Sequence, residues 1–217
     1  HHLHPPVDGY TVQFSDTHSC STSYIVYQLI EALAGTDAID QAMAEALYVG
    51  IMTDTGNFSF SNLTSDLFRT VAVLIDRGVN VPYVNSSVYD NFSEGRMRLL
   101  GYMLNDKMVT DYRYGVAYVS LTEEEMRRFN FIQGDSEGFV NYPLSIRGIR
   151  MSAMFIQTKH SIRVSLRSRG SDVDVNVFAR RYFDGGGHRN AAGGKSYVSM
   201  DETLKNFHTY LKEYFGA

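Results

Sequence analysis

The sequence contains a single cysteine, Cys20, and no long apolar run. One cysteine excludes a disulfide within the chain and a zinc site built from several cysteines. A helix that crosses a membrane needs about 18 or more consecutive apolar residues, so a membrane span is excluded as well. The single cysteine predicts a reducing, cytoplasmic setting, and the absence of a long apolar run predicts no membrane partner.

Positive charge is scarce overall. The net charge is −4 at pH 7, which argues against a protein that coats long duplex nucleic acid. The charge is unevenly spread, however, because residues 161–195 hold six Arg and one Lys against three Asp. That segment has a net charge of +4, which leaves −8 for the rest of the chain. A local cationic surface on an acidic protein favours a small anionic ligand.

The chain has 217 residues, 44% of them hydrophobic, which suffices for one large domain or two small ones. Its first half predicts helices. Ser21 or Thr22 is expected to cap the first helix. Asp37 is expected to begin the second helix, which ends near Gly50 and is followed by a turn-rich stretch at 51–58. The first helix turns five apolar residues inward, namely Ile25, Tyr27, Leu29, Ile30 and Leu33.

From about residue 109 the period changes from that of helices to that of strands. Residues 151–158 and 162–167 predict strands, and in the second of them apolar residues alternate with polar and basic ones. Thr122 followed by Glu125 has the spacing of a helix-capping box. The periodicity of residues 173–183 fits either a strand or a helix.

This change of period places the boundary between two α/β domains near residues 95–110. We expect a first domain over residues 1–95, a helical connector over 96–108 and a second domain over 109–217.

The strongest chemical signal is the string Asp184-Gly-Gly-Gly-His188-Arg-Asn-Ala-Ala-Gly-Gly194. Consecutive glycines let backbone N–H groups approach a ligand closely, and such groups bind phosphate oxygens. His188 adds a donor at the end of the loop. The alternative to a phosphate-binding loop is a tight glycine turn with a histidine on the surface.

This string resembles the signature of the DHH-associated domain, which follows the catalytic domain in DHH-family phosphoesterases and has a relative in alanyl-tRNA synthetases. The strand that contains Arg167 and Ser168 resembles the family pattern too, and guanidinium groups grip phosphate with forked hydrogen bonds. The alternative for these arginines is a solvated strand face. The resemblance favours the helix over 173–183. It also implies that Arg167, Ser168, Gly186, Gly187 and His188 bind the nucleotide end of the substrate.

Two further stretches resemble the catalytic domain of this family. His1-His2-Leu3-His4-Pro5 resembles the Asp-His-His motif without its Asp, and residues 16–22 resemble the segment that follows this motif; the alternative is the remnant of a purification tag. Tyr48-Val-Gly-Ile-Met-Thr-Asp54-Thr-Gly-Asn-Phe58 resembles the motif with the last metal-binding aspartate. Asp54 is otherwise a turn former or helix cap.

The resemblance covers nearly the whole chain and implies an α/β fold, in which the C-terminal part of a DHH catalytic domain precedes a smaller α/β DHH-associated domain. It implies a phosphoesterase that uses two Mn²⁺ ions, with His1 and Asp54 as metal ligands and His2 as a catalytic residue near the phosphate. The upstream aspartates of the family pattern do not appear in this sequence, so we expect an incomplete metal site and little hydrolysis by this polypeptide.

The expected substrates are short oligoribonucleotides and nucleotides such as pAp, as in the bifunctional oligoribonuclease and pAp phosphatase group. Hydrolysis of cyclic dinucleotides or polyphosphate, and a nucleotide- or RNA-binding module without catalysis, are the alternatives. Association into a homodimer stays open.

Overall fold

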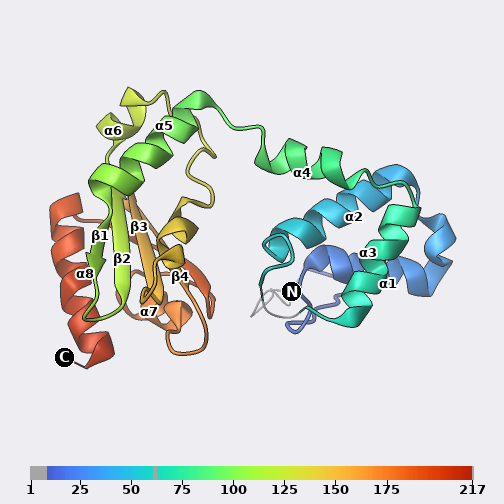
Figure 1. Cartoon of the computed structure of the whole chain (residues 1–217). Helices are drawn as coiled ribbons and strands as arrows, with labels where there is room; N and C mark the ends of the chain where they lie inside the picture. Colours follow the sequence, from blue (N-terminus) through green and yellow to red (C-terminus); the bar gives the residue numbers. More distant parts are fainter. Residues whose placement is uncertain (1–8, 61–62, 217) are drawn as a thin grey trace. The chain divides into compact units, whose positions relative to one another are not determined.

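The computed structural model describes residues 9–60 and 63–216, and these residues form two compact units, one within residues 1–91 and one within 92–217 (Figure 1). The chain is mixed α/β, as predicted. In the described ranges, no helix has both the length and the apolar character that crossing a membrane requires.

The first unit consists of helices. Their bounds are α1 Thr22–Ala34, a 3₁₀ turn Thr36–Ala38, α2 Gln41–Asp54, α3 Ser65–Asp76 and α4 Val81–Tyr89. Apolar residues of α2, among them Leu47, Ile51 and Met52, form the centre of its core.

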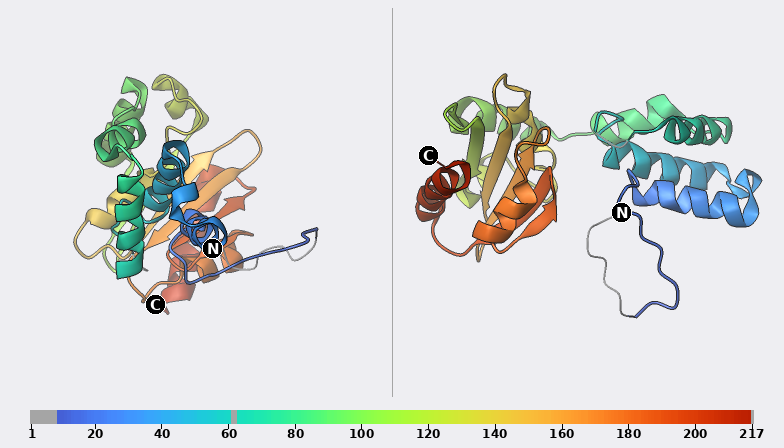
Figure 2. Two further views of the ribbon diagram at one scale, coloured as in Figure 1. Left: turned by 90° about the vertical axis from the view of Figure 1, so that its right-hand side faces the viewer. Right: turned by 90° about the horizontal axis from the view of Figure 1, so that it is seen from below.

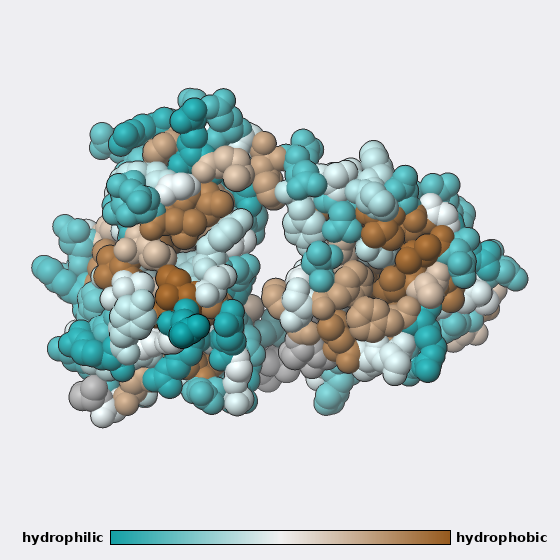
Figure 3. Space-filling model, viewed as in Figure 1, coloured by the Kyte–Doolittle hydropathy of each residue, from teal (hydrophilic) through white to brown (hydrophobic). Residues whose placement is uncertain are grey.

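Two predictions for this unit are wrong. Asp37 lies in the 3₁₀ turn, and the side chain of Asp40 caps α2 by accepting from the Met43 amide at 2.8 Å. Leu29 and Leu33 do not point inward, since they are 52% and 79% exposed. The described residues place no element over that side of α1, and Figure 3 shows apolar surface on this unit.

The second helix also runs further than expected, because Gly50 does not end it. A Cβ on Gly50 would lie 2.8 Å from the Cβ of Ser23, so glycine is needed where α1 and α2 approach closely. The helix therefore continues to Asp54, and the predicted turn begins only after this residue.

The second unit is a six-stranded mixed sheet with helices on both faces (Figures 1 and 2). The strand order is β1-β2-β3-β4-β6-β5, and only the β2–β3 pair is parallel among these neighbours. The strands are β1 Val109–Asp111, β2 Val116–Leu121, β3 Met151–Gln157, β4 Ile162–Ser168, β5 Gly186–His188 and β6 Ala191–Ser196. The helical segments are α5 Glu94–Tyr102, a π turn Met103–Lys107, α6 Glu123–Arg128, a 3₁₀ segment Phe139–Ser145, α7 Val175–Tyr182 and α8 Met200–Phe215.

The strands predicted at 151–158 and 162–167 are confirmed, and residues 173–183 contain a helix, α7, which the Asp174 side chain caps. Residues of the expected connector, 96–108, lie in α5 and the π turn. There Leu99, Leu100 and Met103 pack against strands of the second unit.

The two faces of the sheet have different cores. An aromatic cluster on one face includes Phe155 from β3, Phe178 from α7 and Phe207 from α8. The core of the other face, beneath α5, α6 and the 3₁₀ segment, includes Val119, Leu121 and Met154 from β2 and β3. The right view of Figure 2 shows α7 and α8 on one side of the sheet and α5 on the other.

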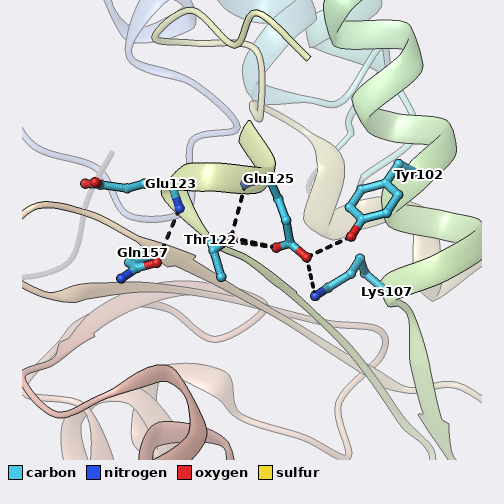
Figure 4. Close-up of polar contacts among 6 residues, drawn as sticks. All are labelled: Tyr102, Lys107, Thr122, Glu123, Glu125 and Gln157. Atoms are coloured by element: carbon cyan, nitrogen blue, oxygen red, sulfur yellow. Dashed lines mark hydrogen bonds and ion pairs between the residues drawn. The ribbon is translucent and has the colours of Figure 1, made fainter. Parts of the chain in front are cut away.

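Glu125 joins α6 to the preceding helical segment (Figure 4). One carboxylate oxygen accepts from Lys107 Nζ at 2.6 Å and from the Tyr102 hydroxyl at 2.7 Å, and the other accepts from the Thr122 amide at 2.8 Å. The predicted capping box is therefore confirmed. Burial raises the pKa of Glu125, but these three donors together outweigh burial and hold it at about 2, below its ordinary 4.5.

This network predicts acid sensitivity. A carboxyl group whose pKa is lowered in the folded state contributes its stability above the unfolded pKa and loses it as the pH falls toward the folded pKa. Glu125→Gln should therefore lower the free energy of unfolding of the second unit at pH 7 by roughly 2–3 kcal/mol and flatten its pH dependence between 4.5 and about 2. Urea unfolding across this range is the measurement. Glu124→Gln, an exposed position of the same helix, is the control, and equal pH profiles for Glu125→Gln and the parent would contradict the assignment.

Candidate functional site

The residues of β4 that alternate with its core positions face the opposite side of the sheet. Ile162, Val164 and Leu166 belong to the aromatic core, which leaves Arg163, Ser165 and Arg167 on the other face. The predicted alternation of apolar and basic residues is thus confirmed. On that face the core of Val119 and Met154 covers β2 and β3, whereas β4, β6 and β5 present polar and small residues.

The strand register brings two predicted residues together. Arg167 lies opposite Ala191 on β6, and Ala191 lies opposite His188 on β5. Because residues opposite each other across a sheet project to the same face, Arg167 and His188 share one row with only the small Ala191 between them. On β3 the same row contains Ser152, the register partner of Arg167. We refer to His188, Ala191, Arg167 and Ser152 as the Arg167 row.

Arg167 is largely buried in this row. Burial lowers the pKa of its guanidinium, while the charge of Glu137 acts in the opposite direction. Its Nη1 donates to the Leu166 carbonyl oxygen at 2.9 Å. A guanidinium remains protonated even with a lowered pKa, so the row contains a fixed positive charge that is shielded from much of the solvent.

Ser152 is a residue that the sequence analysis did not single out. It is fully buried, and its hydroxyl has no hydrogen-bond partner among the described residues. A buried hydroxyl without a partner costs about 1–3 kcal/mol. The sequence signal is faint, since Ser152 is one polar residue in the apolar strand Met-Ser-Ala-Met-Phe-Ile. Its position beside Arg167 places an unsatisfied donor at one end of the row.

Two other predicted residues, Ser168 and Gly187, have contacts on the α7 side. The Ser168 hydroxyl donates to the Val173 carbonyl oxygen at 2.9 Å and accepts from Asn190 Nδ2 at 3.0 Å. The Gly187 amide donates to Asn176 Oδ1 at 2.9 Å. These contacts tie α7 and the β5–β6 turn to the sheet. Binding of substrate by Ser168 and Gly187 stays a prediction.

The glycine string forms a hairpin rather than an open loop. Its residues pair as β5 and β6, with Gly186 opposite Gly193 and Gly187 opposite Ala192. The Gly185 amide donates to the Ala179 carbonyl oxygen at 3.3 Å, so both it and the Gly187 amide are already engaged. These two amides are therefore not available to the predicted cradle of amides.

The glycines of this hairpin have different reasons to be glycine. A Cβ on Gly194 would lie 2.5 Å from the Phe183 carbonyl oxygen, and one on Gly187 would lie 2.5 Å from the Ala191 carbonyl oxygen. In contrast, a Cβ on Gly193 would meet nothing closer than the Val164 carbonyl oxygen at 3.4 Å, and one on Gly186 nothing closer than Asn176 at 3.5 Å. Packing requires glycine at positions 187 and 194 but not at 186 and 193.

A separate hollow lies beyond the end of β6, on the α7 and α8 side. Its volume is about 310 Å³, and Tyr182, Asp184, Lys195, Tyr197, Asn206 and Tyr210 are among its lining residues. Tyr182 and Tyr210 stack there with ring centroids 4.4 Å apart.

In the first unit, Asp54 is exposed at the last position of α2. Burial raises the pKa of the Cys20 thiol, and the charge of Asp54 adds a smaller contribution in the same direction. The next residues turn sharply, since Gly56, Asn57 and Phe58 all have φ between 54° and 58°. For non-glycine residues this conformation costs of order 1–3 kcal/mol.

Buried Thr55 stabilises this turn. Its hydroxyl donates to the Ile51 carbonyl oxygen at 2.7 Å and accepts from the Phe58 amide at 3.1 Å. Strained backbone held in this way is typical of functional turns, so the geometry agrees with a special role for the segment around Asp54.

The metal site cannot be assembled from the described residues. Within residues 9–60 and 63–216, no three or more His, Cys, Asp or Glu side chains form a group that could hold a metal ion. His1 and His2 lie outside the described residues. The described part of the chain therefore does not by itself fit a dimetal centre, and the roles of His1, His2 and Asp54 stay predictions.

Comparison with known protein families decides the identity of the second unit. Residues 111–217 match the model of the DHHA1 domain. The second unit is a DHHA1 domain. The predicted resemblance to DHH-family phosphoesterases with a DHH-associated domain is thereby confirmed.

Relatives of the whole chain agree with this assignment. The bifunctional oligoribonuclease and PAP phosphatase of Bacillus subtilis is 28% identical over 97% of this chain, and the probable one of Streptococcus mutans is 28% identical over 89%. An exopolyphosphatase-related protein from Bacteroides fragilis has the same fold, with a TM-score of 0.92 and 38% identity over 98% of this chain. The chain spans 67%, 61% and 62% of the lengths of these three proteins.

The two kinds of glycine in the DHHA1 domain can be separated by experiment. Gly194→Ala should destabilise the domain by about 1–3 kcal/mol, because its Cβ would overlap the Phe183 carbonyl group. Gly193→Ala, the neighbouring position with room for a Cβ, should change the free energy of unfolding by less than about 0.5 kcal/mol. Denaturant unfolding of both variants tests this, and equal losses would show that the hairpin is packed differently.

Proposed function

We propose that this chain is part of a phosphoesterase that hydrolyses short oligoribonucleotides and nucleotides of the pAp type, and that its DHHA1 domain holds a phosphate of the substrate. The observation that supports this most is the register that sets Arg167 and His188 in one row. The names of the two bacterial oligoribonuclease relatives support the choice of substrate.

The Arg167 row is suited to an anionic group. Arg167 supplies a permanent charge and forked donors, and its partial burial strengthens attraction to an anion because less water screens it. His188 can add a second donor from the far side of Ala191. Two donors that approach from opposite sides would fix the position of a phosphate and thereby orient the rest of the substrate for hydrolysis.

For manganese, we propose the chemistry that the ions would supply and not the geometry of their site. Bound divalent ions would make a water more acidic and neutralise charge on the transferred phosphoryl group. For the chain itself we propose Asp54 as a metal ligand at the end of α2, together with His1 as a ligand and His2 as the catalytic residue. The strained turn after Asp54 supports a fixed position for this carboxylate.

Polyphosphate hydrolysis is the second candidate, because the Bacteroides fragilis protein is described as exopolyphosphatase-related. Polyphosphate carries no base or ribose. The Arg167 row would bind its phosphates equally well, so a comparison of substrates must decide between the two.

Nucleotide binding by the chain is the first test. Titration calorimetry should show AMP binding, and Arg167→Gln and His188→Ala should each weaken it by about tenfold to a hundredfold, since each removes a charge-assisted or directed hydrogen bond. Arg181→Gln removes an exposed arginine from α7 and serves as the control. If both row variants bind AMP as well as the parent does, the Arg167 row is not the phosphate site.

Hydrolysis is the second test. With Mn²⁺ present, the full-length protein should release mononucleotides from di- to pentanucleotides and phosphate from pAp, and a chelator should abolish both. Asp54→Asn should remove most of the turnover and leave AMP binding intact, because Asp54 lies in a different unit from the Arg167 row. Failure of the metal-loaded protein on both substrates, with turnover of polyphosphate, would favour the second candidate.

A further inference from the structure

A second pair of cations lies on the same face of the sheet as the Arg167 row. Arg163 on β4 is opposite Lys195 on β6, four residues along each strand from Arg167 and Ala191. Both side chains are exposed, and in the described ranges neither takes part in an ion pair. Two cations side by side attract an anion and repel each other when none is bound.

The row between the two cationic rows contains small residues. Ser165 on β4 lies opposite Gly193 on β6, and we refer to this pair as the glycine strip. Packing does not require glycine at position 193, because a Cβ there would meet nothing closer than the Val164 carbonyl oxygen at 3.4 Å. Gly186, the partner of Gly193 on β5, lies at the edge of the sheet, where a Cβ would face Asn176 and the Arg180 guanidinium of α7 at 3.5–3.6 Å.

The two rows are too far apart to act as one cluster. Four residues of strand separate Arg163 from Arg167 by about 13 Å. Each guanidinium is also anchored locally, since Arg163 Nη2 donates to the Ser136 hydroxyl at 3.0 Å and Arg167 Nη1 donates to the Leu166 carbonyl oxygen at 2.9 Å. The face therefore offers two separate positions for an anion, with the glycine strip between them.

A buried polar group without a hydrogen-bond partner lies next to the strip. Ser152, in the Arg167 row and diagonal to Ser165, has a fully buried hydroxyl with no hydrogen-bond partner in the described part of the chain. This unsatisfied donor is a cost to the fold at the end of the row that contains Arg167.

We propose that Arg163 and Lys195 hold a second phosphate of the same substrate, so that a single strand of at least two nucleotides crosses the glycine strip. This inference rests on the proposed function, in which the Arg167 row holds the first phosphate. It assigns Arg163 and Lys195 the role of selecting oligonucleotides over mononucleotides. A positively charged groove that follows the backbone is the usual way in which proteins bind short single strands.

The experiment compares two probes on the 217-residue chain, AMP with one phosphate and the dinucleotide pApA with two. Calorimetry of the parent should show tighter binding of pApA. Arg163→Gln combined with Lys195→Gln should weaken pApA binding by about tenfold or more and leave AMP binding within about twofold. The matched control, Lys205→Gln with Lys212→Gln, removes two exposed charges from α8 on the opposite face and should leave both affinities unchanged.

The possible results distinguish a failure of the second phosphate position from a failure of the proposed function. If the parent binds pApA no better than AMP, or if the Arg163/Lys195 variant keeps the parent's preference, the second phosphate position is wrong while the first stands. If the parent binds neither probe, the proposed function of the DHHA1 domain fails. Should the loss of the Arg163–Ser136 contact disturb folding, Lys195→Gln alone decides the matter, because no described residue bonds to its ammonium group. It should then weaken pApA binding alone, and unchanged pApA binding would overturn the inference.

Discussion

The antiparallel pairing of β4 with β6 is the constraint on which the candidate site depends. In this register Arg167 lies opposite Ala191 and Arg163 opposite Lys195, while the alternate residues of both strands face the aromatic core. A shift of one residue in either strand would turn its basic side chains toward that core and its apolar side chains toward water. The same register therefore fixes both the cationic face and the core. The free energy gained by burying the core also holds the arginines in position.

Glycine and aromatic packing maintain this register. Beneath the sheet, the ring centroid of Phe207 lies 5.0 Å from that of Phe155 and 6.0 Å from that of Phe178. Gly194 lets β6 approach Phe183, where any side chain would collide with the backbone. Asn176 of α7 satisfies the Gly187 amide on the edge strand β5. The hairpin is thus held from the core side, which leaves its other face available to a ligand.

Much of the fold could be predicted because its signals are local. The Ser21 cap, the capping box at Thr122 and the alternation in β4 each depend on residues within one turn or strand. The second helix start was wrong since Asp37 and Asp40 are both good caps, and only the packing of α2 decides between them. Leu29 and Leu33 were predicted to be buried from periodicity, which gives a face but does not say whether another element covers it.

The candidate site was harder to predict from the sequence than the fold was. The residues Arg167 and His188 could be named, but their common row depends on the β5–β6 hairpin and on the pairing of β4 with β6, in which Arg167 and Ala191 are 24 residues apart in the sequence. The hairpin was taken for a loop because glycine strands lack the side chains that signal a strand. Ser152 gave only a faint sequence signal, as one polar residue in an apolar strand, and it was identified from its burial and its place beside Arg167.

The central claim is that the polar face of the DHHA1 sheet, rather than another surface of the domain, binds the nucleotide. An NMR titration of the ¹⁵N-labelled chain with AMP tests this most directly. The account predicts that amide shifts concentrate on β4, β5 and β6 around Arg167 and His188, and that the Arg167 side-chain Nε–H shifts with them. Shifts centred instead on Tyr182, Asn206 and Tyr210, which line the hollow beside α8, would contradict it.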